Sequence, residues 1–76
     1  MPIELDDVVK TVGLVLGRRK VAPSDRIYED LGAESADVLN LVATMEEKYG
    51  IAIDEASVPS VRTVADLHDL VRRTAG

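Results

Sequence analysis

Apolar residues recur at helical spacing in three separate stretches of the chain, and this periodicity limits its possible folds more than any other feature. The first stretch covers residues 4–17 and the second covers residues 35–49, and each ends at or next to a glycine. The third follows Thr63, which together with Asp66 is typical of a helix N-terminus. The pattern predicts an all-α fold, a small bundle of three to four helices with a long loop between the first two.

The same spacing predicts which side chains face the core. Leu41, Val42 and Met45 are expected to face the first and last helices. Residues 51–53 are too few for an independent strand, so they are interpreted as a connector that places two isoleucines in the core. Pro59 limits any helix near it to about one turn. The other expected inward residues are Leu5, Val8, Val9, Val12, Val15, Leu16, Val38, Tyr49, Val64, Leu67, Leu70 and Val71.

Residues 21–33 form the predicted long loop, because proline, glycine and polar residues interrupt the helical pattern there. Ile27, Tyr28 and Leu31 are expected to pin this loop to the core. Loops of this length are uncommon in compact domains and are often functional. The loop leads to Ser35.

Chain length limits both the size and the chemistry of the molecule. Seventy-six residues supply one core, so residues 1–76 are expected to form a single domain without a deep catalytic cleft. The chain has no cysteine, which excludes disulfides and thiolate metal sites.

The acidic start of the chain, and the lack of the ~20 consecutive apolar residues that span a bilayer, favour a cytoplasmic location without membrane insertion. The starting Met and the short tail favour a free-standing protein.

Charge is distributed unevenly along the chain. The formal net charge of -5 argues against binding to nucleic acid. Residues 25–55 carry nine acidic and two basic residues, a net of -7 that leaves +2 for the rest. Such a field steers a basic partner toward the acidic segment, although it is equally consistent with a solvated surface that has no partner. The basic run at residues 18–20 is interpreted as the end of the first helix, not as a binding patch.

Groups suited to catalysis are scarce. His68 is the only histidine and is predicted to lie at the margin of the last helix, so no Ser-His-Asp set can be argued. The five glycines are isolated and form no phosphate-binding loop. We therefore predict no catalytic residue and no metal site, and expect that the protein is not an enzyme.

Ser35 is the remaining candidate for chemistry, because it ends the long loop and opens the most acidic helix. One interpretation is structural, since serine is a good N-cap whose oxygen accepts hydrogen bonds from first-turn amides. The other is a modification site, since a helix N-terminus favours the negative charge of a phosphodiester.

The segment Asp30-Leu31-Gly32-Ala33-Glu34-Ser35 and the acidic helix after it resemble the acyl carrier protein family. The resemblance covers nearly the whole chain, through the Gly-Ile-Ala-Ile connector to the final helix at Thr63. It implies that Ser35 accepts a covalent 4'-phosphopantetheine arm, which a phosphopantetheinyl transferase moves from coenzyme A using magnesium. The arm would hold acyl intermediates as thioesters for a fatty acid, polyketide or specialised lipid or secondary-metabolite pathway.

The resemblance also implies which surface meets partners. Acyl-loading and acyl-processing enzymes with basic patches would recognise the acidic second helix, while the space between the helices would shelter an apolar cargo. We expect a monomer, as is usual for lone carriers. The implied partner-recognition residues are Glu34, Asp37, Leu39, Asn40, Ala43, Glu46 and Glu47.

Four positions depart from the family's pattern. The usual triplet Asp-Ser-Leu is replaced by Glu34-Ser35-Ala36, and Asn40 and Ala43 stand where Glu and Met are common. These changes favour a specialised pathway over general fatty acid synthesis. Two alternatives stay open: an aminoacyl or peptidyl carrier, although these usually show a glycine pair before the serine, and a carrier-fold interaction module that never takes the arm.

Overall fold

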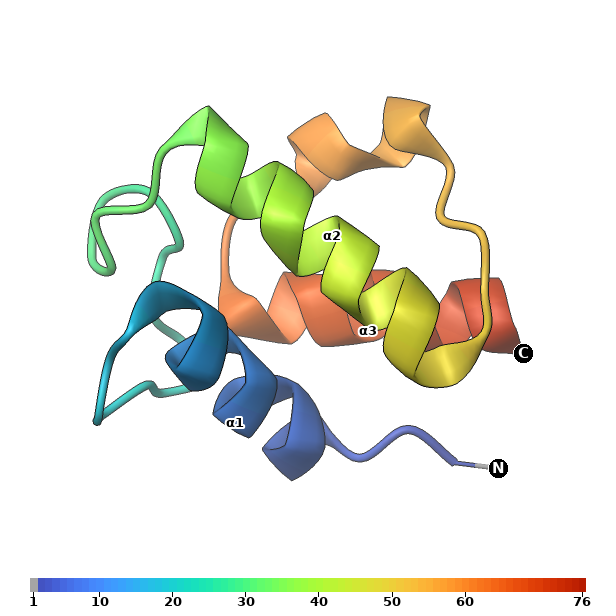
Figure 1. The fold of residues 1–76 in the computed structure, drawn as a ribbon, viewed down its shortest axis with the longest axis horizontal. Coiled ribbons are helices and arrows are strands. Elements are labelled where there is room, and N and C mark those ends of the chain that lie inside the picture. The colour runs from blue at the N-terminus through green and yellow to red at the C-terminus, as the bar shows by residue number, and fades with distance from the viewer. Residues whose placement is uncertain (1) are drawn as a thin grey trace.

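The computed structural model describes residues 2–76, which form three α-helices and one short 3-10 helix (Figure 1). Apart from one isolated antiparallel bridge between Arg26 and Thr63, these residues contain no β-structure. The predicted all-α fold with a long loop between the first two helices is confirmed. In chain order the elements are α1 (Leu5–Leu16), α2 (Ser35–Tyr49), η1 (Glu55–Ser60) and α3 (Val64–Ala75).

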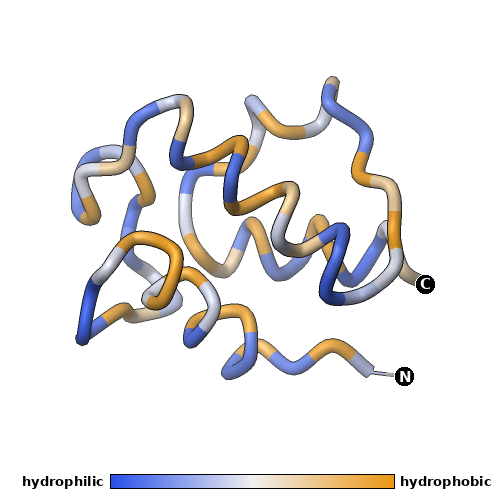
Figure 2. Tube along the Cα trace, in the orientation of Figure 1, coloured by the Kyte–Doolittle hydropathy of each residue, from blue (hydrophilic) through white to orange (hydrophobic). Residues whose placement is uncertain are grey.

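The core lies where the three α-helices meet, and α1 packs against both α2 and α3. Apolar and polar positions are interspersed along each helix (Figure 2), so each helix has one side suited to burial. Leu41, Val42 and Met45 are buried, as expected. The fully buried large side chains are Val8, Val12, Ile27, Leu41, Met45, Val64 and Val71.

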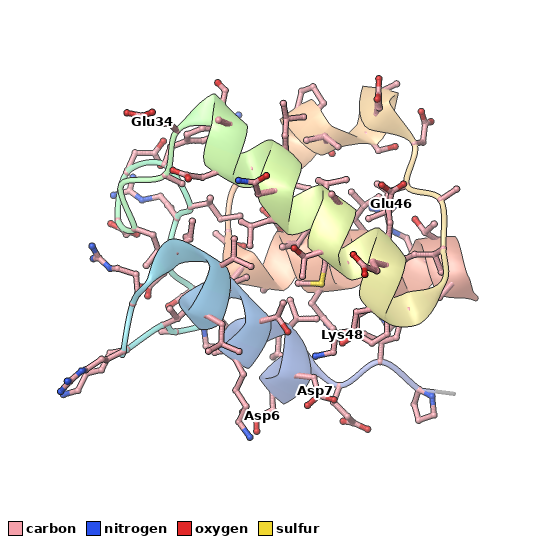
Figure 3. The ribbon with its side chains drawn as sticks, viewed as in Figure 1. Asp6, Asp7, Glu34, Glu46 and Lys48 are labelled. Atoms are coloured by element: carbon pink, nitrogen blue, oxygen red, sulfur yellow. The ribbon has the colours of Figure 1, made fainter. Side chains whose placement is uncertain are left out.

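A polar contact also joins α1 to α2. The buried Thr11 hydroxyl donates to the Asp7 carbonyl oxygen at 2.8 Å and accepts from Lys48 Nζ at 2.9 Å. Figure 3 shows Lys48 reaching from α2 toward α1. Lys48 is an exposed residue whose side chain places its ammonium group against the buried Thr11 hydroxyl. It therefore supplies a second hydrogen-bond partner to a hydroxyl that is shielded from water.

The long loop is fixed by the core and by the start of α3. Ile27 N donates to the Arg62 carbonyl oxygen at 2.8 Å, and Val64 N donates to the Asp25 carbonyl oxygen at 3.1 Å. Ile27 and Leu31 are buried, as predicted, but Tyr28 is 45% exposed and its predicted role as a pin is wrong. In this turn Ile27 and Leu31 share the inward side, and the residue after Ile27 points away from it.

The segment between α2 and α3 follows the sequence prediction with one exception. Ile53 is buried, but Ile51 only half so. The helix η1 contains Pro59 and is short, as predicted, although its six residues of 3-10 helix make about two turns and not one. Thr63 Oγ1 accepts from Asp66 N at 3.1 Å, which confirms the predicted N-cap. Between residues 2 and 76, no helix combines the length and the apolar character needed to cross a membrane.

Candidate functional site

Ser35 is the first residue of α2, and the N-cap is Glu34. The structural interpretation of Ser35 as the cap is therefore wrong. A capping residue needs an extended backbone, which Glu34 has (φ -101°, ψ 172°), and Glu34 N donates to Asp37 Oδ2 at 2.9 Å. Within residues 2–76 the exposed hydroxyl of Ser35 has no hydrogen-bond partner. It is thus not committed to holding the helix end.

The residues before Ser35 present it at the surface. Gly32 adopts φ +68°, a conformation that favours glycine, and reverses the chain. Ala33 then buries its side chain, and its N–H donates to the Ile27 carbonyl oxygen at 3.1 Å. Glu34 leaves the core at the start of α2 (Figure 3). The chain is therefore anchored two residues before Ser35 and exposed from Glu34 onward.

The electrostatic field at Ser35 favours an anionic group. The first-turn amides of α2 have no carbonyl partners within the helix, and the dipole of a helix places partial positive charge at this end. A phosphate attached to Ser35 Oγ would lie at this positive end of the helix.

Most of the side chains predicted to recognise partners lie on the outer side of α2. Leu39 is 64% exposed, and Glu34, Asn40, Ala43 and Glu47 are exposed as well. Asp37 is half-buried, and its Oδ2 accepts from Glu34 N. The outer side of α2 thus combines one large apolar side chain with acidic and small ones.

Glu46, one of the residues implied to recognise partners, is less exposed than its neighbour Glu47. It is half-buried, and its Oε2 accepts from Ile53 N at 2.9 Å. Figure 3 shows its carboxylate on the side of α2 that faces the connector after the helix. A connector with no helical hydrogen bonds needs such a partner for its amide, and Glu46 supplies it.

A groove of about 480 Å³ runs between α2 and η1. Ser35, Leu39, Ala43 and Glu46 lie along one stripe of α2, because their spacing follows the helical repeat. The groove therefore begins about 6 Å from Ser35 along the helix axis and ends about 17 Å from it. It is lined by Leu39, Val42, Ala43, Ile53, Val58 and Pro59, with Glu46 and Glu55 as its acidic members.

Sequence reasoning missed the η1 side of this groove. Ile53 was predicted as a core residue and Pro59 as a limit on helix length, while Val58 had no assigned role. Packing of Ile53 and Val58 on the core, the hydrogen bond from Ile53 to Glu46 and the short helix after it place these residues beside α2. Nothing in the local pattern marks these contacts.

The structure offers no alternative centre of metal chemistry in the part of the chain that it describes, where no three His, Cys, Asp or Glu side chains cluster as metal ligands. His68 lies at the boundary, as predicted, and its Nε2 is 2.8 Å from the Ile3 carbonyl oxygen. That contact ties the N-terminal segment to α3.

Comparisons with known proteins agree on one family. The family model described as a phosphopantetheine attachment site matches residues 6–71. The acyl carrier protein of Syntrophobacter fumaroxidans is 30% identical over 73 residues, covering 96% of this chain and 89% of its own. A chain in the solved structure of the ishigamide ketosynthase/chain length factor superposes with a TM-score of 0.80 at 21% identity, covering 95% and 93% of the two chains. The solution structure of the oxytetracycline acyl carrier protein gives a TM-score of 0.76 at 20% identity, with coverage of 97% and 83%.

Proposed function

The chain belongs to the acyl carrier protein family, and from this premise we propose that Ser35 is the residue that bears its covalently attached 4'-phosphopantetheine. Carriers of this family are not enzymes, and separate synthase enzymes act on what they hold. The observation that carries the proposal is the exposed, unpartnered hydroxyl at the N-terminus of α2, in line with the groove.

Ser35 acts as an acceptor in the attachment step. Its Oγ bonds to the phosphorus next to the pantetheine of coenzyme A, the bond from that phosphorus to the nucleotide phosphate breaks, and the hydroxyl proton passes to the transferase. The first-turn amides of α2 then stabilise the charge of the new phosphodiester. The attached group supplies a thiol that holds an acyl chain as a thioester.

The groove between α2 and η1 gives the arm and an apolar cargo a surface to lie on. Its wall at Leu39, Val42 and Val58 removes hydrocarbon from water, while the acidic Glu46 lies at its far end. Leu39 is both exposed and part of the lining, so it touches either the cargo or a partner enzyme.

Partner enzymes with basic patches dock on the outer side of α2. Residues 25–55 hold most of the acidic charge, and Glu47 is exposed on the same side of the helix as Leu39. Charge of one sign increases the association rate and makes it depend on salt. Glu34 stands beside Ser35 and would contact the transferase.

A specialised pathway fits this surface better than general fatty acid synthesis. Asn40 and Ala43 are exposed on α2, so the acid and the methionine that are common there are missing from the docking surface itself. One structural match is an oxytetracycline carrier and another belongs to a ketosynthase structure, which supports this preference. Efficient elongation by a reconstituted general fatty acid synthase would contradict it.

Intact-mass measurement tests the attachment. Incubation with coenzyme A, magnesium and a broad-specificity phosphopantetheinyl transferase should add one phosphopantetheine to the native chain and none to Ser35→Ala. Ser24→Ala is the matched control, because it removes another exposed serine hydroxyl, from the long loop, and should load normally. No gain in the native chain with several transferases would favour the unmodified interaction module.

A further inference from the structure

A second hollow, of about 530 Å³, lies on α1 and shares no lining residue with the groove beside α2. Its apolar lining comes from Val9, Gly13, Leu14 and Val21. Lys10, Arg18 and Arg19 line it as well. The function proposed above makes no use of this surface.

Gly13 builds the floor of this hollow. A Cβ at Gly13 would lie 2.9 Å from the Arg18 carbonyl oxygen, which is too close, and 3.6 Å from Val21 Cγ2. Glycine inside a helix costs about 1 kcal/mol relative to alanine. Here it lets the chain after α1 fold back onto the helix, where Arg18 N donates to the Gly13 carbonyl oxygen at 2.8 Å.

Leu14 is the apolar feature of this face. It is 84% exposed, the largest value among the exposed large apolar side chains of the described chain. Val9 and Val21 beside it are half-buried. A leucine in this position is anchored by a helix yet gives almost nothing to the core, which suits contact with another molecule.

Positive charge surrounds Leu14. Residues 8–24 include four basic residues and no acidic one. Lys10 reaches Asp6 at 3.5 Å, but both side chains are exposed and the pair is weak. In residues 2–76 no salt bridge includes Arg18 or Arg19. The last turn of α1 contains no basic residue, because α1 ends at Leu16 with Gly17 as its C-cap and the basic run follows outside the helix.

We propose that this face, made of Val9, Lys10, Gly13, Leu14, Arg18, Arg19 and Val21, is a second docking surface that binds an acidic amphipathic helix of a partner protein. Leucine-type side chains of that helix would pack on Leu14 and Val21, and its carboxylates would pair with Arg18 and Arg19. The charge is opposite to that of α2, so the partner belongs to a different class from the basic enzymes. The two surfaces share no lining residue.

Nuclear magnetic resonance with a defined probe tests the proposal on the full chain labelled with ¹⁵N. The probe is a synthetic helical peptide of leucine and glutamate at amphipathic spacing, and its control is the same peptide with lysine in place of glutamate. The glutamate peptide should shift amides of residues 9–21, and the lysine peptide should not. The Ser35→Ala protein should bind equally well, which separates this result from the carrier role.

Variants assign the binding to the named side chains. The double variant Arg18→Glu, Arg19→Glu should weaken binding by at least about tenfold, and Leu14→Ser should weaken it similarly. Arg62→Glu makes the same type of charge change at an exposed site outside the hollow and should leave binding unchanged.

Four results would overturn the proposal. One is equal binding of both peptides, and another is no shift in residues 9–21. The third is binding of the native protein, but not Leu14→Ser, to phosphatidylglycerol vesicles, which would make the face a membrane surface. The fourth is self-association in sedimentation that Arg18→Glu abolishes, which would make a second copy of the chain the occupant.

Discussion

Ser35 owes its availability to its neighbours on both sides. Glu34 is the N-cap of α2, and its backbone N–H donates to Asp37. The serine hydroxyl is therefore not needed to cap the helix. The choice between Glu34 and Ser35 as cap could not be predicted from the sequence, because both are polar residues at the helix boundary. In the structure Ala33 N donates to the Ile27 carbonyl oxygen, and the extended backbone ends at Glu34, one residue later.

Ser35→Ala should therefore change the free energy of unfolding by no more than about 0.5 kcal/mol, since an exposed side chain without a partner is replaced by a good helix former. Chemical denaturation measures this. A loss of about 1 kcal/mol or more would mean that the hydroxyl caps the helix after all. Asp37→Ala, which removes the acceptor for Glu34 N, should show that larger loss.

Glu46 should be a structural residue as much as a docking one. Glu46→Ala removes the acceptor of the Ile53 amide, and hydrogen exchange of that amide should speed up by about tenfold, equivalent to about 1.4 kcal/mol. Glu46→Gln keeps an oxygen acceptor and should preserve most of the protection. Glu47→Ala is the matched control. Equal protection in all three variants would show that the carboxylate does not hold the connector.

At the scale of elements, α2 divides its two sides between the core and the solvent. Leu41 is 1% exposed and Leu39 is 64% exposed, although they are two residues apart. Helical periodicity places them on different sides, which is why the inward face of α2 could be predicted from sequence alone.

These two leucines provide a matched pair. Leu41→Ala should destabilise the protein by about 2 to 5 kcal/mol, because it leaves a cavity between packed helices. Leu39→Ala should cost about 0.5 kcal/mol or less. Denaturant titration of both variants is the measurement. Similar losses for the two would contradict the assignment of the inward face.

The positions of loop residues were harder to predict from the sequence than those of helix residues. Helix positions follow from local signals such as apolar spacing, glycine stops and the Thr63 cap. The exposure of Tyr28 and the half-burial of Ile51 depend on contacts with distant parts of the chain. A pattern of a few residues holds no information about those contacts, so the groove and the hollow emerge only from the folded chain.

At the scale of the whole molecule, two aspartates make the stability of the junction between the long loop and α3 depend on pH. Asp66 Oδ2 accepts from Thr63 N and Arg62 N, and these backbone bonds hold the pKa of Asp66 below its usual value. The Arg26 amide, with the Arg26 guanidinium second, lowers the pKa of Asp30 in the same way. A carboxyl whose pKa falls on folding stabilises the protein above its unfolded pKa of about 3.9, and this contribution is lost as the pH falls further.

The midpoint of thermal unfolding should accordingly fall as the pH drops below about 4. Asp66→Asn should lower the midpoint at neutral pH, and the gap to the native chain should narrow as the medium becomes more acidic. Scans over a pH series measure this. A gap of constant size at every pH would show that ionisation of Asp66 does not support the junction.

The whole molecule also separates its charge, with a net of -7 over residues 25–55 and four basic residues without an acidic one over residues 8–24. The net value of -5 hides this separation, and the count by segment gave -7 for residues 25–55 and +2 for the rest without placing the basic residues on one surface. The fold adds the basic half, because it gathers Lys10 and the run after Gly17 around Leu14. If both proposals hold, the carrier presents two docking surfaces of opposite sign.

Locating the modification tests the central claim most directly. The native chain should be loaded with coenzyme A and transferase, digested, and its peptides fragmented in a mass spectrometer. The account predicts one phosphopantetheine on the peptide that contains Ser35, with the fragments assigning it to that residue. A modification assigned to any other residue, or a loaded protein whose Ser35 peptide is unmodified, would contradict it.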